Sequence, residues 1–102
     1  MDTKHFSSIG EILRHLRIKN KLPLRKVAAF LDIDQSFLSK IERGERIATK
    51  EQVIKLAEIF NVEKKELIIK YLSDKIVYHL TNEVFAMEAL REAEKKIYNG
   101  KK

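Results

Sequence analysis

Five polar side chains between residues 35 and 43 share hydrogen-bonding chemistry and one side of a helix. Leu38 and Ile41 fall between them at the spacing of the opposite, apolar side. Side chains of these polar types read the edges of bases or hold phosphates. The pattern therefore favours a surface that binds double-stranded DNA. The five residues are Gln35, Ser36, Ser39, Lys40 and Arg43.

A second short helix must precede this polar row and support it. Apolar residues recur there at three- and four-residue spacing, which predicts a helix with one buried face. Arg25 and Lys26 lie between them and are expected to stay in water. The apolar positions are Leu24, Val27, Ala28 and Leu31, and Asp32 ends the face.

A tight polar turn connects the two helices. Asp34 is expected to accept hydrogen bonds from the first-turn amides of the second helix, while Ile33 packs on Leu38. Gly44 suits a left-handed cap after the second helix. Residues 24–44 therefore predict a helix-turn-helix.

Further helices are expected on both sides of this motif. Ser8 with Glu11, and Thr49 with Gln52, have the spacing of capping boxes. With one proline, three glycines and no alternating apolar run, nothing supports a sheet. We predict an all-α bundle of five helices with a helical C-terminal extension. The first helix is expected to end near Asn20, the fourth near Asn61, and the fifth to begin near Glu63.

The extension, residues 74–102, continues an apolar stripe and then adds a last helix, for which Asn82 is a candidate cap. Its apolar seam has the 4, 3, 4 spacing of helix pairing but is too short for a stable isolated coiled coil. The seam could fold back on its own domain or pack on a twin subunit, and a DNA reader with two-fold symmetry favours the twin. The stripe is Ile69, Leu72, Ile76 and Leu80, and the seam is Ala86, Leu90, Ala93 and Ile97.

Length and charge are consistent with a small DNA-binding domain. The chain has 102 residues and a net charge of +6. Residues 1–50 carry 11 Lys or Arg against 6 Asp or Glu, whereas residues 51–102 carry 10 against 9. A basic half attracts polyanions such as nucleic acid, although the same charge could simply serve solubility.

Together, these residues make the stretch from about 8 to 72 resemble the Cro/C1-type (XRE) helix-turn-helix family. The likeness includes Ala28 at the helix crossing, Ile33 in the turn, the pair Ile41 and Glu42, and Gly44. The resemblance implies a five-helix, lambda-repressor-like domain, residues 1–73, in which the second motif helix enters the major groove and dimers bind paired half-sites.

The resemblance also implies residue roles. Arg17 and Glu42 sit where the family often has a buried ion pair. Lys26 is included in the DNA-binding surface as a solvent-exposed cation. The implied base-facing residues are Gln35, Ser36, Ser39 and Lys40, and the implied phosphate-facing residues are Arg43 and Arg46.

Two parts of the motif depart from the family pattern. Pro23 and Leu24 replace the usual Ser or Thr followed by Gln, which removes one expected phosphate contact. Glu45 replaces a common lysine and would repel DNA, so Arg46 is expected to anchor that loop alone. Ala48 replaces the usual proline before the fourth helix.

Other chemistry finds little support. His5, His15 and His79 are far apart and lack acidic neighbours at ligand spacing, so no metal site is expected. No glycine-rich phosphate loop or nucleophile elbow occurs, which argues against an enzyme and against a cofactor. Without cysteine, a signal-peptide run or a membrane-spanning segment, the chain is expected to be cytoplasmic and independent of membranes.

These features predict a dimeric, sequence-specific regulator that occupies a palindromic operator. A repressor, an autoregulator, a controller of a restriction-modification operon or an antitoxin would all suit a chain of this size. The alternative is a protein-interaction module, in which the helix-turn-helix is a scaffold and the C-terminal helix binds a partner protein.

Overall fold

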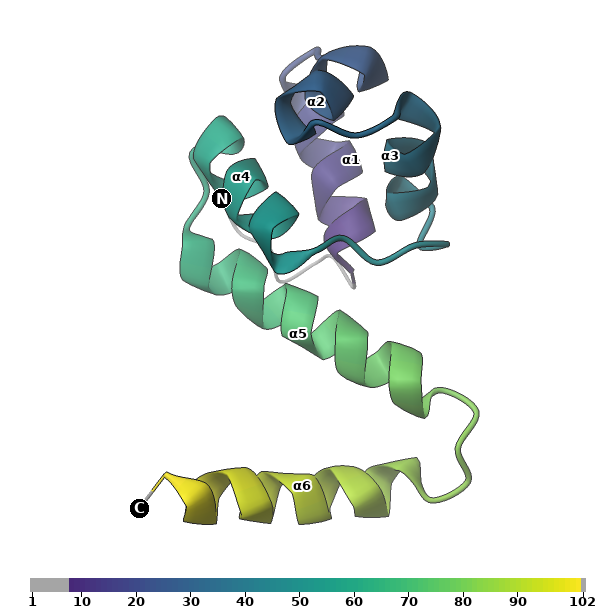
Figure 1. Cartoon of the computed structure of the whole chain (residues 1–102), viewed down its shortest axis with the longest axis vertical. Helices are drawn as coiled ribbons and strands as arrows, with labels where there is room; N and C mark the ends of the chain where they lie inside the picture. Colours follow the sequence, from purple (N-terminus) through teal and green to yellow (C-terminus); the bar gives the residue numbers. More distant parts are fainter. Residues whose placement is uncertain (1–7, 102) are drawn as a thin grey trace.

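A computed structural model of the chain describes residues 8–101 (Figure 1). This part is built from helices, with no strand among the described residues, which confirms the predicted all-α class with a helical extension. The helices are α1 (Ile9–Lys19), α2 (Leu24–Leu31), α3 (Gln35–Glu42), α4 (Lys50–Phe60), α5 (Lys64–Leu80) and α6 (Ala86–Gly100).

Several helix ends follow from local side-chain chemistry. The Ser8 hydroxyl accepts a hydrogen bond from the Glu11 amide at the start of α1. Thr49 and Gln52 form a complete capping box at the start of α4. The left-handed conformation needed after α3 is supplied by Gly44, whose φ is +78°. Short local sequence signals therefore fix the start of α1, the start of α4 and the end of α3.

Two expected caps are wrong. Asp34 occupies the N-cap position of α3, but its exposed side chain makes no capping hydrogen bond. Asn82 does not begin α6. Successive turns join Glu83 to Leu80 and Ala86 to Glu83 through backbone hydrogen bonds, so the N-cap of α6 is Phe85.

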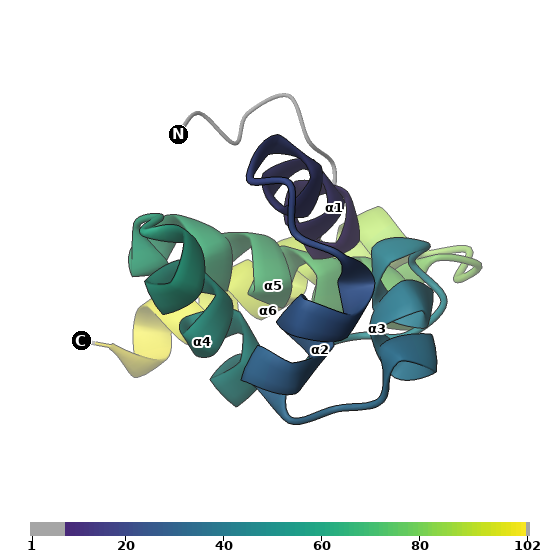
Figure 2. The same cartoon turned by 90° about the horizontal axis from the view of Figure 1, so that it is seen from above.

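Helices α1 to α5 surround one apolar core (Figure 2). Helix α4 packs on α2 and α5, while α1 packs on α3 and α5. The core holds the two motif helices against a fixed frame, which leaves their polar sides outward. Its most completely buried large side chains are Ile12, Leu13, Val27, Leu38, Val53 and Leu67.

Helix α5 joins this frame to the C-terminal extension. It continues without a break through residue 73, where the sequence placed a domain boundary. Near its middle, the carboxylate Oδ2 of Asp74 accepts a hydrogen bond of 2.8 Å from the backbone amide of Ile9. The first part of the extension is therefore tied to the first turn of α1.

Replacing Asp74 by Ala should destabilise the fold, because the partly buried Ile9 amide loses its acceptor. A loss of about 1 to 3 kcal/mol is expected in urea unfolding. Asp74→Asn is the matched variant because its amide oxygen can still accept this bond. If Asp74→Ala unfolds at the wild-type urea concentration, the bond contributes nothing to stability.

Asp74 also gives the stability a defined pH dependence. Burial raises the pKa of this carboxyl above its ordinary value, against the opposing hydrogen bond from Ile9. The folded state therefore holds the proton to a higher pH than the unfolded state. This contribution increases stability as the pH falls through the raised pKa, and it should disappear in Asp74→Asn.

Candidate nucleic-acid interface

The predicted polar row lies on the outward side of α3. Gln35, Ser36 and Lys40 are exposed and Ser39 is half-buried. On the other side of the helix, Leu38 and Ile41 are almost completely buried in the core. The packing of α3 on α1 and α2 thus presents a continuous set of polar side chains to a ligand outside the fold.

Arg17 of α1 and Glu42 of α3 hold these two helices together. The Arg17 Nε lies 2.6 Å from Glu42 Oε2, and Arg17 Nη2 lies 3.0 Å from Oε1. Arg17 Nη1 also donates to the carbonyl of Leu22, at 3.1 Å. Only 4 % of the Glu42 side chain is exposed, and its hydrogen bonds raise the pKa of Arg17. This two-pronged ion pair fixes the end of α3 against α1.

Gly10 allows the same two helices to approach closely, a role the sequence did not indicate. A Cβ atom at this position would lie 2.2 Å from the carbonyl oxygen of Ile41 and 3.0 Å from that of Glu42. Because both neighbours are backbone atoms, no side-chain rotation relieves the clash. A glycine two residues before Ile12 and three before Leu13, inside a predicted helix, was the available signal.

The basic residues after α3 are not equivalent. Arg43 donates through Nε to the Glu45 carboxylate and through Nη1 to the Ser39 hydroxyl, the latter at 2.5 Å. Its hydrogen bond to Glu45 raises the pKa of Arg43 and lowers the pKa of Glu45, so both groups stay charged. Arg46 lies exposed beyond them. Glu45 therefore competes with any phosphate for the Arg43 guanidinium.

Lys26 lies exposed on α2, the helix that packs beside α3. It adds a cation to the surface formed by the two motif helices, and long cationic side chains at such positions attract phosphate. The residues expected to bind DNA thus come from α2, α3 and the loop that follows α3.

Other kinds of site find no support in the described residues. No group of three or more His, Asp or Glu side chains within residues 8–101 could hold a metal ion, and His5 lies outside that range. None of the helices in the same range has the length and apolar character required to cross a membrane.

A helix with an outward polar side, supported by a second helix of equal length across a tight turn, is the arrangement of a helix-turn-helix domain. Comparison with protein families matches residues 13–67 to the helix-turn-helix family. The chain belongs to this family, in its Cro/C1 (XRE) type, whose members are DNA-binding regulators and not enzymes. No curated protein and no solved structure gives a significant match.

Replacing Glu45 by Gln should increase DNA affinity several-fold for all sequences alike. The substitution releases Arg43 and removes a negative charge from the surface that is expected to face phosphates. Binding measured by fluorescence anisotropy across a salt series should show the largest gain at low salt.

Glu58→Gln is the matched control, because it removes the same charge from an exposed position on α4. Equal gains in Glu45→Gln and Glu58→Gln would mean that only net charge matters. Unchanged affinity in Glu45→Gln would show that Arg43 does not approach the phosphates.

Proposed function

We propose that this protein is a sequence-specific transcriptional regulator that binds a palindromic operator as a homodimer, acting as a repressor or an autoregulator. The observation that carries the proposal is the outward side of α3, where Gln35, Ser39 and Lys40 form a polar row above a buried apolar side. Gln suits the adenine edge and Lys the guanine edge, and Ser36 at the first turn lies beside them.

Arg46, Arg43 and Lys26 are assigned to the phosphates on either side of the groove. Their contacts would position α3 without selecting a sequence. Arg46 is the main anchor after α3, because Glu45 already engages Arg43. Occupation of an operator by such a surface needs no cofactor.

Residues 1–73 are assigned to DNA binding and residues 74–102 to dimerisation. Support for the second role comes from α6, which buries none of its residues in the single chain. A helix with an apolar seam and no intramolecular core is expected to pack on another molecule. The seam residues are Ala86, Leu90, Ala93 and Ile97.

The same unburied α6 favours a second candidate, a regulator whose extension binds a different protein, as an antitoxin does. The two candidates differ in what the purified protein does alone. A homodimeric regulator needs only DNA, whereas a partner-dependent protein would remain monomeric until its partner is added.

Selection from a random DNA library with the purified full chain tests the proposal. We expect enrichment of a two-fold symmetric sequence whose half-sites lie about one helical turn apart, bound by two copies of the protein. Enrichment of a single half-site bound by one copy would contradict the dimeric function. Failure to enrich any sequence would contradict sequence-specific binding itself.

A further inference from the structure

The exposed apolar surface of the molecule is concentrated on α5, α6 and the turn between them. Of the twelve large apolar side chains exposed within residues 8–101, ten lie between residues 69 and 98 and are 44 % to 85 % exposed. These ten lie on more than one face of the two helices. Leu72, Ile76, Ile97 and Tyr98 line a groove between α5 and α6, whereas Val77 and Tyr78 line a hollow beside the start of α1.

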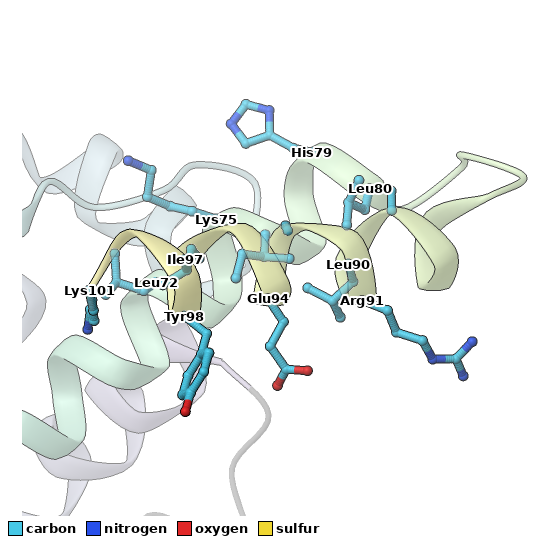
Figure 3. A pocket seen from close by; sticks show the side chains of 13 residues that line it. Leu72, Lys75, His79, Leu80, Leu90, Arg91, Glu94, Ile97, Tyr98 and Lys101 are labelled. Atoms are coloured by element: carbon cyan, nitrogen blue, oxygen red, sulfur yellow. The ribbon is translucent and has the colours of Figure 1, made fainter.

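Part of this surface lines a groove between α5 and α6. Helix α6 folds back beneath α5 after the turn, and the two helices diverge (Figure 1). The groove between them has a volume of about 1070 Å³. Figure 3 shows the side chains that line it, and its apolar walls are Leu72, Ile76 and Leu80 from α5 and Leu90, Ala93 and Ile97 from α6.

The α6 seam has the pattern of a helix that pairs with an antiparallel copy of itself. In an antiparallel pair, Leu90 can face Ala93 of the partner subunit while Ile97 faces Ala86 of the partner subunit. Each of these facing pairs joins one large and one small side chain, so the two helices can approach closely without a void or a clash. A parallel pair would instead place Leu90 against its own copy and leave a gap at Ala93.

The charges of α6 favour the same direction. Residues 86–94 contain Glu88, Glu92 and Glu94 with one arginine, a net charge of −2, while residues 95–101 contain three lysines and no acid. An antiparallel pair brings each acidic half beside the other copy's basic half, whereas a parallel pair superposes like charges. A two-fold axis across the helices produces this antiparallel arrangement.

We propose that a second copy of this chain covers the α5–α6 groove, with its α6 antiparallel to the first, so that two α5 and two α6 helices form one interface. The apolar walls of the groove, supplied by both α5 and α6, are the surface that the second copy would cover. The inference rests on the homodimeric function proposed above. It adds that the two α6 helices run antiparallel and that α5 forms part of the interface.

This arrangement links dimerisation to DNA reading through α5. The C-terminal half of α5 forms one wall of the groove, and its N-terminal half packs on α4. Asp74, between the two, bonds to the first turn of α1. The distance between the two recognition helices is therefore set by continuous helix instead of a flexible linker.

Site-directed cross-linking tests the direction directly, because the natural chain contains no cysteine. In the proposed pair, residue 86 lies beside residue 97 of the partner subunit but about 16 Å from its own copy along the helix axis. A disulfide requires Cα atoms within about 7 Å. Mixing Ala86→Cys with Ile97→Cys under mild oxidation should give a cross-linked dimer, and neither variant alone should give one.

Substitution in the α5 wall supplies a second measurement. Ile76→Asp should weaken dimerisation at least about tenfold in sedimentation, because it places a charge in the apolar groove. Ile18→Asp is the control, since Ile18 is a similarly exposed apolar residue on α1 outside the groove. Equal sedimentation of Ile76→Asp and wild type would remove α5 from the interface.

The outcomes separate this inference from the proposed function. Cross-linking of Ala86→Cys alone would indicate a parallel pair and overturn the proposed interface. If the wild-type protein is a dimer that binds a symmetric operator, but the mixture of Ala86→Cys and Ile97→Cys gives no cross-link, the proposed interface is overturned and the proposed function stands. A wild-type monomer that binds a single half-site would overturn both.

Discussion

Replacing Glu42 by Ala is expected to destabilise the protein by about 3 to 5 kcal/mol, because Arg17 would be left as a largely buried charge without its partner. Side-chain exposure is 15 % for Arg17 and 4 % for Glu42, so most of both side chains lies out of contact with water. The loss is a large part of the stability of a small domain. Thermal unfolding should begin at least about 10 °C lower.

The double variant Arg17→Met, Glu42→Leu separates pairing from packing. Removing both charges leaves no uncompensated ion, and apolar replacements of similar size are often close to neutral. The double variant should therefore recover much of the stability lost in Glu42→Ala. An unchanged melting temperature in Glu42→Ala would show that the pair is not a structural tie.

Replacing Gly10 by Ala is expected to destabilise the fold by about 1 to 3 kcal/mol or more, because its Cβ would lie 2.2 Å from the Ile41 carbonyl oxygen. A Gly→Ala substitution within a helix ordinarily stabilises it, because Ala is the better helix former by about 1 kcal/mol, so a loss of stability at position 10 would be the opposite of the usual result. The backbones of α1 and α3 must separate, which also displaces the recognition helix. Chemical unfolding and DNA affinity should both report the change.

Gly100→Ala is the matched control within the same chain. Gly100 is also helical, and nothing lies within 4 Å of the position its Cβ would take. This substitution should leave stability unchanged or raise it slightly. If Gly10→Ala behaves like Gly100→Ala, the close approach of α1 and α3 is not required by the fold.

The helices of the motif and the start of α4 could be predicted from sequence because their signals are local. The apolar spacing of Val27 and Leu31, the capping pair of Thr49 and Gln52, and Gly44 each act within a few residues. Asn82 was misleading for the same reason. Asparagine is a common N-cap residue, but backbone turns through residue 85 determine where α6 begins.

Contacts between distant parts of the chain could not be predicted in this way. Asp74 and Ile9 are 65 residues apart, and a single aspartate on a helix gives no indication of which amide it meets. Gly10 is an unfavourable helix residue until the backbone of α3 is placed beside it. The Arg17–Glu42 contact was expected only through resemblance to the family, where the fold brings those positions together.

The most direct test of the account is the base preference of recognition-helix variants. Gln35→Ala and Lys40→Ala should each lose about 1 to 3 kcal/mol of discrimination at one operator position, in each half-site, while other positions keep their preference. Lys65→Ala, which removes an exposed cation from α5, should keep the wild-type preference throughout. Unchanged base preference in both recognition-helix variants would contradict the assignment of α3 as the element that reads DNA.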